Sequence, residues 1–204
     1  MADERAFDAV LCDFDGVLRR HDDAAVEQLE GKYGVPPGTL LATAMAEELL
    51  RPAILGEVSD DEWRRNVAVQ LLPEYCIEVA TDLVADWSGL VGAVDPQVRA
   101  LLAEVRAAGV RVVLMSNATT RLEDELEVLG IAGDIDIVVS SARLGVAKPE
   151  PAAYFAAAQL AEADVTRCLF VDDAAINVEV AQAVGMQGHV YTGADELRTA
   201  LELS

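Results

Sequence analysis

The segment from Val10 to Leu18 constrains the fold more than any other. It begins with an apolar run that suits a buried strand and ends in two carboxylates, Asp13 and Asp15, followed by Gly16. Side chains two positions apart on an extended chain point the same way, so the two carboxylates should lie close together beyond the strand. Their repulsion favours a bound cation or a shared proton, although an isolated motif of this kind is also compatible with an acidic turn. One strand is not stable alone, so it must join a sheet formed later in the chain.

Residues 19–88 follow a different pattern, with apolar residues at helical spacing among charged ones. We predict four amphipathic helices there, separated at 36–38 and 73–74 by proline-containing breaks. The third begins at Ser59, which suits a capping residue before an acidic first turn, and the fourth ends near Trp87. Because the segment has no β pattern, it is predicted to be a helical insert between the first strand and the rest of the sheet.

From residue 91 onward, helical segments alternate with short β-rich runs. Strands linked by helices form a parallel, doubly wound sheet covered on both faces. The predicted fold class is therefore α/β, a doubly wound parallel sheet with a small helical bundle. The expected domains are an α/β core of residues 1–18 and 89–204 and a helical domain of residues 19–88. The predicted strands cover 111–115, 135–139, 168–171 and 189–191, and the helices 96–108, 120–129, 151–163, 174–184 and 195–203.

The charge and cysteine content of the chain limit the classes of binding partner that we expect. The 204 residues carry a formal net charge of −21, which disfavours nucleic acid and anionic membranes, because both need clustered Lys and Arg. With only Lys32 and Lys148 as lysines, an anionic substrate would need a local cation at its site. Three cysteines without paired spacing favour a reducing cytoplasm, and no apolar run suits a secretory signal or a membrane span. The expected protein is cytoplasmic, and monomer and homodimer stay open.

Polar residues follow four of the predicted strands at their carboxyl ends, where ligands bind in open parallel sheets. Each alone could be a helix cap or a solvated turn. Together they gather four carboxylates, which favours a divalent, oxygen-preferring cation such as Mg²⁺. A hydroxyl and an ammonium could then hold phosphate oxygens, so the edge is predicted to be a phosphoryl-transfer site. The residues are Asp13, Asp15, Ser116, Asn117, Lys148, Asp172 and Asp173.

Four segments resemble, in order and spacing, the motifs of the haloacid-dehalogenase-like hydrolase superfamily. They read D-F-D-G-V-L, apolar-S-N, K-P-E-P and F-V-D-D-x-x-x-N-V. The helical insert is similar to the cap of the subclass whose lid follows the first motif. The resemblance implies a Rossmann-like core and a magnesium-dependent phosphatase that acts on a small phosphorylated metabolite through an aspartyl-phosphate.

The same resemblance implies a role for each residue. Asp13 is the expected nucleophile and Asp15 the acid and base. Asn177 is expected to orient the loop with the acid pair. The implied catalytic set is Asp13, Asp15, Ser116 and Lys148. The phosphate would be bound by Ser116, Asn117 and Lys148. The metal would be held by Asp13, by the backbone carbonyl of Asp15, and by Asp172 and Asp173. Which of Asp172 and Asp173 contacts the ion directly is left open.

Other reactions stay open within the resemblance. A phosphomutase shares all four motifs, whereas a dehalogenase generally lacks an acid at the position of Asp15 because halide leaves unprotonated. The segment 19–21 departs from sugar-phosphate members and is either a solvated hinge or a contact for an anionic substrate group. In another class, a phospho-acceptor signalling domain is disfavoured by the order of the acidic residues, and a non-catalytic binding domain by the intact motifs.

Overall fold

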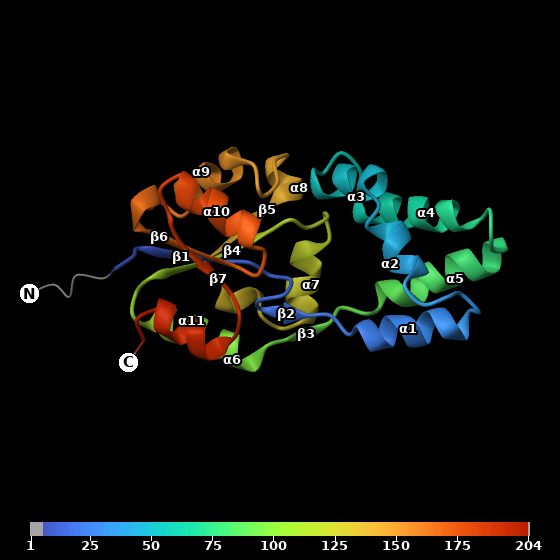
Figure 1. The fold of residues 1–204 in the computed structure, drawn as a ribbon, viewed down its shortest axis with the longest axis horizontal. Coiled ribbons are helices and arrows are strands. Elements are labelled where there is room, and N and C mark those ends of the chain that lie inside the picture. Colours follow the sequence, from blue (N-terminus) through green and yellow to red (C-terminus); the bar gives the residue numbers. More distant parts are fainter. Residues whose placement is uncertain (1–5, 204) are drawn as a thin grey trace, which may run out of the picture.

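The computed structural model describes residues 6–203 and places the first strand, β1 (Ala9–Cys12), in the middle of a five-stranded sheet (Figure 1). The order is β5-β4-β1-β6-β7, and all neighbouring strands are parallel. This confirms the predicted α/β fold. The other strands are β4 (Arg111–Ser116), β5 (Ile137–Ser140), β6 (Cys168–Asp172) and β7 (Gln187–Val190).

Both faces of the sheet are buried, because alternate side chains of β1 enter different apolar clusters. Ala9 and Leu11 pack with α9 and α10, whereas Val10 and Cys12 pack with α6, α7 and α11. Burying one such aliphatic side chain contributes about 1.5–3 kcal/mol, so this central strand stabilises both layers. From residue 96 onward, the helices are α6 (Pro96–Ala107), α7 (Leu122–Val128), α8 (Ser141–Leu144), α9 (Pro151–Leu160), α10 (Ala175–Ala183) and α11 (Ala194–Ala200), with 3₁₀ turns at Ala132–Asp134 and Val165–Arg167.

The strand register brings the polar residues to one edge. Cys12 lies opposite Leu114 of β4 and Val171 of β6, so the residues after these positions leave the sheet side by side. Ser116 pairs in register with Ser140 of β5. As parallel strands all end on the same side, the chemistry-bearing residues share the carboxyl edge.

Residues 23–88 form five helices rather than the predicted four, which we call the helical unit. The expected second helix is interrupted at Met45 and Ala46, where Ala46 is extended (φ −56°, ψ 132°) and a new helix begins with Glu47. Two acidic residues in the first turn of this helix suit its positive N-terminal end. The helices are α1 (Asp23–Lys32), α2 (Thr39–Ala44), α3 (Glu47–Ile54), α4 (Asp60–Leu71) and α5 (Ile77–Ser88).

The helical unit has its own apolar cluster, centred on Trp63 and Trp87, whose rings meet edge to face at 5.4 Å. Ser59 caps α4 as predicted and forms a capping box with Glu62. Figure 1 shows the unit beside the end of the sheet, beyond α7 and α8. The division into two domains stays a prediction.

A two-stranded antiparallel ribbon, which the sequence pattern did not predict, lies where the chain enters and leaves the helical unit. It pairs β2 (Arg19–Arg20) with β3 (Ala93–Val94). Gly92 has φ +74°, and a Cβ there would lie 2.6 Å from the Arg20 carbonyl oxygen. The close pairing therefore requires glycine at this position.

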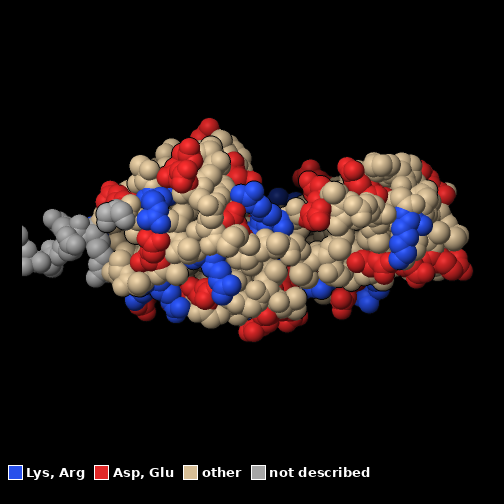
Figure 2. Space-filling model, turned by 90° about the horizontal axis from the view of Figure 1, so that it is seen from below, with Lys and Arg blue, Asp and Glu red and all other residues tan. Residues whose placement is uncertain are grey.

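Figure 2 shows an elongated molecule that is hollowed between its two ends, with acidic side chains widespread over the visible face. Across residues 6–203, no helix combines the length and apolar character needed to cross a membrane. Cys12 and Cys168 are buried in strands, and Cys76 is exposed. All three cysteines are free thiols.

Candidate active site

Asp13 is the first residue beyond β1 and is buried. Its backbone N–H donates to the Val171 carbonyl at 2.8 Å, which holds the residue against the end of β6. Its Oδ1 accepts from the Phe14 backbone N–H at 2.7 Å and contacts Lys148 Nζ at 2.8 Å. Burial raises the pKa of Asp13 above its ordinary range, Lys148 opposes this shift, and the nearby charge of Asp172 adds to it.

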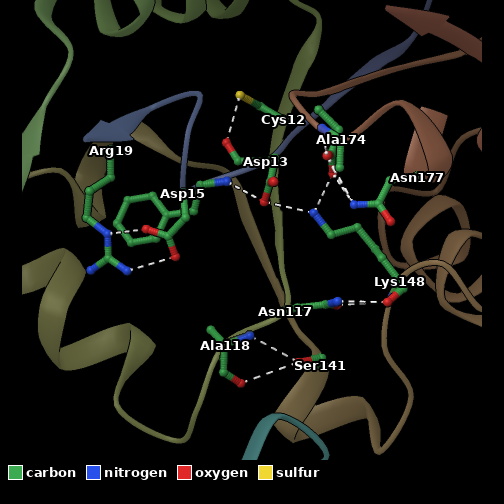
Figure 3. Close-up of polar contacts among 12 residues, drawn as sticks. Cys12, Asp13, Asp15, Arg19, Asn117, Ala118, Ser141, Lys148, Ala174 and Asn177 are labelled. Atoms are coloured by element: carbon green, nitrogen blue, oxygen red, sulfur yellow. Dashed lines mark hydrogen bonds and ion pairs between the residues drawn. The ribbon is translucent and has the colours of Figure 1, made fainter. Parts of the chain in front are cut away.

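Lys148 bridges two carboxylates. Its Nζ contacts Asp13 Oδ1 at 2.8 Å and Asp172 Oδ2 at 2.7 Å, and its side chain is only 2% exposed (Figure 3). Burial disfavours the ammonium, but the two carboxylates outweigh that effect and raise the pKa of Lys148. The lysine is therefore charged and fixed between the two acids.

Asp172 ends β6 and is fully buried, whereas Asp173 is exposed. Asn177, on the first turns of α10, donates from Nδ2 to both Asp172 oxygens at 3.1 Å, and the Ala174 N–H donates to Oδ1 at 2.9 Å. The hydroxyl of Tyr154 donates to the Asn177 carbonyl at 2.8 Å. These bonds fix the orientation of the Asp172 carboxylate.

The acidic residues suit a divalent cation. One oxygen each from Asp13, Asp172 and Asp173 lies within 4.8 Å of the others. Three carboxylates against one ammonium leave two negative charges uncompensated. Burial and the charge of Asp172 raise the pKa of Asp173, which is the expected result of that excess. An all-oxygen set of this kind suits Mg²⁺.

Gly16 explains how the loop after β1 comes so close to the acid pair. It has φ +84°, and a Cβ on it would lie 2.1 Å from Asp173 Oδ2. Any side chain would therefore both strain the backbone and displace that carboxylate. The sequence pattern did not predict this contact between Gly16 and Asp173.

The side chain of Asp15 contacts none of Asp13, Asp172 and Asp173 and has its own set of partners. Its side chain is 40% exposed, and it accepts from Arg19 Nε at 2.6 Å and Arg19 Nη2 at 2.9 Å. Its Oδ1 also lies 2.8 Å from His21 Nε2. Burial alone would raise its pKa, but the bonds from His21 and Arg19 lower the pKa of Asp15 to about 2. Figure 3 shows the carboxylate turned toward Arg19, so the two acids of the first motif have different partners.

Arg19 is buried rather than part of a solvated hinge. Besides Asp15 it contacts Glu125 on α7, and its guanidinium lies 4.1 Å from the centre of the Phe14 ring. Arg20, next to it, is exposed and pairs with Asp95 at 2.8 Å. The expectation of a solvated residue is therefore wrong for Arg19, whereas the exposure of Arg20 does not decide between a hinge and a substrate contact.

Ser116 ends β4 and is buried, and Asn117 follows it. The Asn117 side chain donates to the Lys148 carbonyl and accepts from the Lys148 N–H, both at 2.8 Å. Because that side chain is already occupied, a phosphate contact from Asn117 would have to come from its backbone N–H. The structure thus brings Ser116, Asn117, Lys148, Asp13 and Asp172 to one edge.

A cavity of about 910 Å³ lies between this edge and the helical unit. Asp15 and Asn117 line it on the side of the sheet, and Trp63 and Trp87 line it on the side of the helices. Asp60, at the start of α4, also lines it and accepts from the Thr119 hydroxyl at 2.7 Å. The cavity therefore connects the carboxyl edge with side chains of the helical unit.

Sequence reasoning missed the partners of Asp15 and the contacts across the cavity. The spacing of Arg19 four residues after Asp15 was the only local indication of their pairing. Glu125 is 106 residues from Arg19, and Thr119 is 59 residues from Asp60. Neither pair has a pattern that sequence reasoning could use.

Comparison with known proteins agrees with this architecture. The sequence profile described as haloacid dehalogenase-like hydrolase matches residues 7–185. A phosphatase from Mycobacterium tuberculosis is 33% identical over 105 residues, which is 50% of this chain and 48% of that protein. A sesquiterpene phosphatase from Aspergillus oryzae is 28% identical over 97% of this chain and 95% of its own length.

Among solved structures, a HAD family enzyme from Bacteroides thetaiotaomicron in complex with magnesium and inorganic phosphate has the same fold. Its TM-score is 0.73 at 20% identity, covering 91% of this chain and 94% of that one. The family profile spans most of the chain. The chain therefore belongs to the haloacid dehalogenase-like hydrolases.

Proposed function

We propose that this hydrolase is a magnesium-dependent phosphatase that cleaves small phosphomonoesters through an aspartyl-phosphate at Asp13. The observation that carries the proposal is the set of hydrogen bonds made by the Asp13 carboxylate. Oδ1 is held by the Phe14 N–H and by Lys148 Nζ, and no donor within residues 6–203 contacts Oδ2. A carboxylate that is buried, oriented by one oxygen and open at the other is arranged to attack phosphorus.

The residues present suit a magnesium ion. Asp13, Asp172 and Asp173 would hold it, and the family resemblance adds the backbone carbonyl of Asp15. When bound, the ion supplies positive charge that offsets the carboxylates and the phosphate oxygens. Lys148 adds a fixed positive charge next to Asp13.

Two proton transfers complete the reaction. In the first step, an Asp13 oxygen bonds to phosphorus as the bond from phosphorus to the leaving oxygen breaks, and Asp15, which must enter this step in its acid form, gives that oxygen its proton. In the second step, Asp15 takes a proton from water, which attacks phosphorus and releases inorganic phosphate and free Asp13. Arg19 and His21 favour the carboxylate form of Asp15, which the second step needs. The first step therefore requires Asp15 to take up a proton before the leaving oxygen departs. Ser116, Asn117 and Lys148 would bind the phosphoryl group.

The names of the relatives support phosphate rather than halide as the reacting group, since both curated proteins described above are phosphatases. Asp15 supports the same conclusion, because a halide needs no acid when it leaves. The helical unit covers the cavity next to Asp15, which supports its proposed role as a cap domain of residues 19–88.

The test is turnover of a panel that contains aryl and alkyl phosphates, a haloacid and a hexose-phosphate mutase assay, with and without a chelator. We expect phosphate release that requires added magnesium and that falls by at least about a thousandfold in Asp13→Asn. Asp124→Asn, which changes an exposed carboxylate on α7, is the matched control and should retain full activity. Full activity in Asp13→Asn, or turnover of the haloacid alone, would refute the proposal.

A further inference from the structure

The cavity beside Asp15 has an apolar wall formed by the helical unit. Its members lie on α2, α3, α4 and α5 and at Met45, the residue that follows α2. Met45 is 49% exposed, and neither Met45 nor Ile54 belongs to the three apolar clusters of the described chain. The wall includes Leu41, Met45, Leu50, Ile54, Trp63 and Trp87.

The cationic side chains that line the cavity are already paired. Arg64 Nε contacts Asp60 Oδ2 at 2.6 Å, Arg19 contacts Asp15 and Glu125, and Arg20 contacts Asp95. The guanidinium of Arg64 also lies 4.5 Å from the centre of the Trp87 ring, and its Nη1 is buried without a hydrogen-bond partner among the described residues. A second anionic group on a substrate would therefore have to share an arginine that already pairs with a carboxylate.

The size and the position of the cavity also suit the leaving group of a substrate. A volume of about 910 Å³ lies at the upper end of the range for small-molecule pockets, about 300–1,000 Å³. The cavity is continuous with Asp15 and Asn117, so the leaving group of a phosphomonoester bound at Asp13 would extend into it. An apolar group there would cover Met45 and Ile54 and leave the existing ion pairs intact.

We infer that the preferred substrate is a phosphomonoester of an apolar alcohol, with its hydrocarbon part bound against Leu41, Met45, Leu50 and Ile54. This inference rests on the proposed phosphatase function and names its substrate class. Each methylene buried against the wall contributes about 0.8 kcal/mol, which corresponds to about fourfold in kcat/KM.

The experiment compares kcat/KM for acetyl phosphate, a series of straight-chain alkyl phosphates from butyl to decyl, glycerol phosphate and phosphoglycolate. We expect about a fourfold rise per added methylene until the wall is covered, and octyl phosphate at least about a hundredfold above glycerol phosphate. No hydrolysis of any of these compounds would remove the phosphatase proposal itself. Hydrolysis of acetyl phosphate without a rise along the alkyl series would overturn only the apolar substrate class.

Two variants locate the binding surface. Met45→Gln keeps the side-chain length but makes it polar, so the ratio of kcat/KM for octyl phosphate to that for acetyl phosphate should fall about tenfold. Val69→Gln changes a 60% exposed side chain on α4 that does not line the cavity, and it should leave the ratio at the wild-type value. An unchanged ratio in Met45→Gln, or an equal fall in both variants, would overturn the assignment.

Discussion

Asp60 joins the helical unit to the loop after β4, and its removal tests how strongly the two are held together. Its side chain is 7% exposed and accepts from Arg64 Nε at 2.6 Å and from the Thr119 hydroxyl at 2.7 Å. Its backbone N–H donates to the Thr120 hydroxyl at 3.0 Å. Asp60→Ala would remove both side-chain bonds and leave Arg64, itself mostly buried, without its anionic partner.

The loss of this ion pair sets the expected decrease in the free energy of unfolding. Breaking a buried ion pair by removing one partner typically costs about 3–5 kcal/mol, because the remaining charge stays buried and unpaired. With an unfolding entropy of about 2.1 cal/mol/K per residue, a chain of 204 residues loses about 7–12 °C in Tm for that change. The hydrogen bond from Thr119 is part of the total, since bonds to charged groups contribute about 1.5–3 kcal/mol.

Thermal and urea unfolding, each followed by circular dichroism, measure the effect. The matched control is Asp61→Ala, the exposed neighbour in the same first turn, where the loss should stay below about 1 kcal/mol. A double-mutant cycle of Asp60→Asn with Thr119→Val should give a coupling of about 1–2 kcal/mol. If Asp60→Ala unfolds within about 1 kcal/mol of the wild type, the contact contributes little and the reasoning fails.

Three other changes test separate parts of the structure. Gly16→Ala should weaken magnesium binding at least about tenfold by calorimetry with unchanged circular dichroism, because its Cβ would displace Asp173; wild-type affinity would contradict this. Tyr154→Phe should cost about 1–2 kcal/mol in urea unfolding, since it removes the donor to the Asn177 carbonyl, and a neutral result would show that the bond contributes no stability. Burial lowers the pKa of His189 in the folded protein. As the pH falls below about 6.5, the unfolded chain therefore binds a proton at this histidine more readily than the folded protein does, and the free energy of unfolding decreases. His189→Asn should therefore lose less stability than the wild type between about pH 7.5 and about pH 5.5, and an equal loss would show that another group is responsible.

The parts of the fold that sequence reasoning predicted are those with a local chemical cause. The apolar run before Asp13 and the one before Asp172 are strands, and the residues just after them lie at one edge because parallel strands end together. Ser59 begins a helix because its side chain satisfies the free N–H groups of the first turn. In each case, the residues that decide the outcome are neighbours in sequence.

What sequence reasoning could not predict depends on distant partners. Glu30 resembles one more solvated acid of α1, yet it is fully buried and accepts from the backbone N–H groups of Gly38 and Leu40 at 2.7 and 2.6 Å. The ribbon of β2 and β3 has two residues in each strand, too few for an alternating pattern. Such features follow from the assembled fold and have no periodicity of their own.

The pairing of Asp15 with Arg19 connects the proposed acid and base to the two-stranded ribbon, where the chain enters the helical unit. The loop between them is closed by two backbone bonds, from the Arg19 N–H to the Phe14 carbonyl at 2.7 Å and from the Gly16 N–H to the Arg19 carbonyl at 2.9 Å. Arg19 is also the first residue of the ribbon, opposite Val94. Because the side-chain and backbone bonds hold Asp15 to the same residue, its carboxylate follows the ribbon rather than β1. A shift of the helical unit that bends the ribbon would therefore reorient Asp15, while Asp13, fixed by Val171 and Lys148, would keep its place.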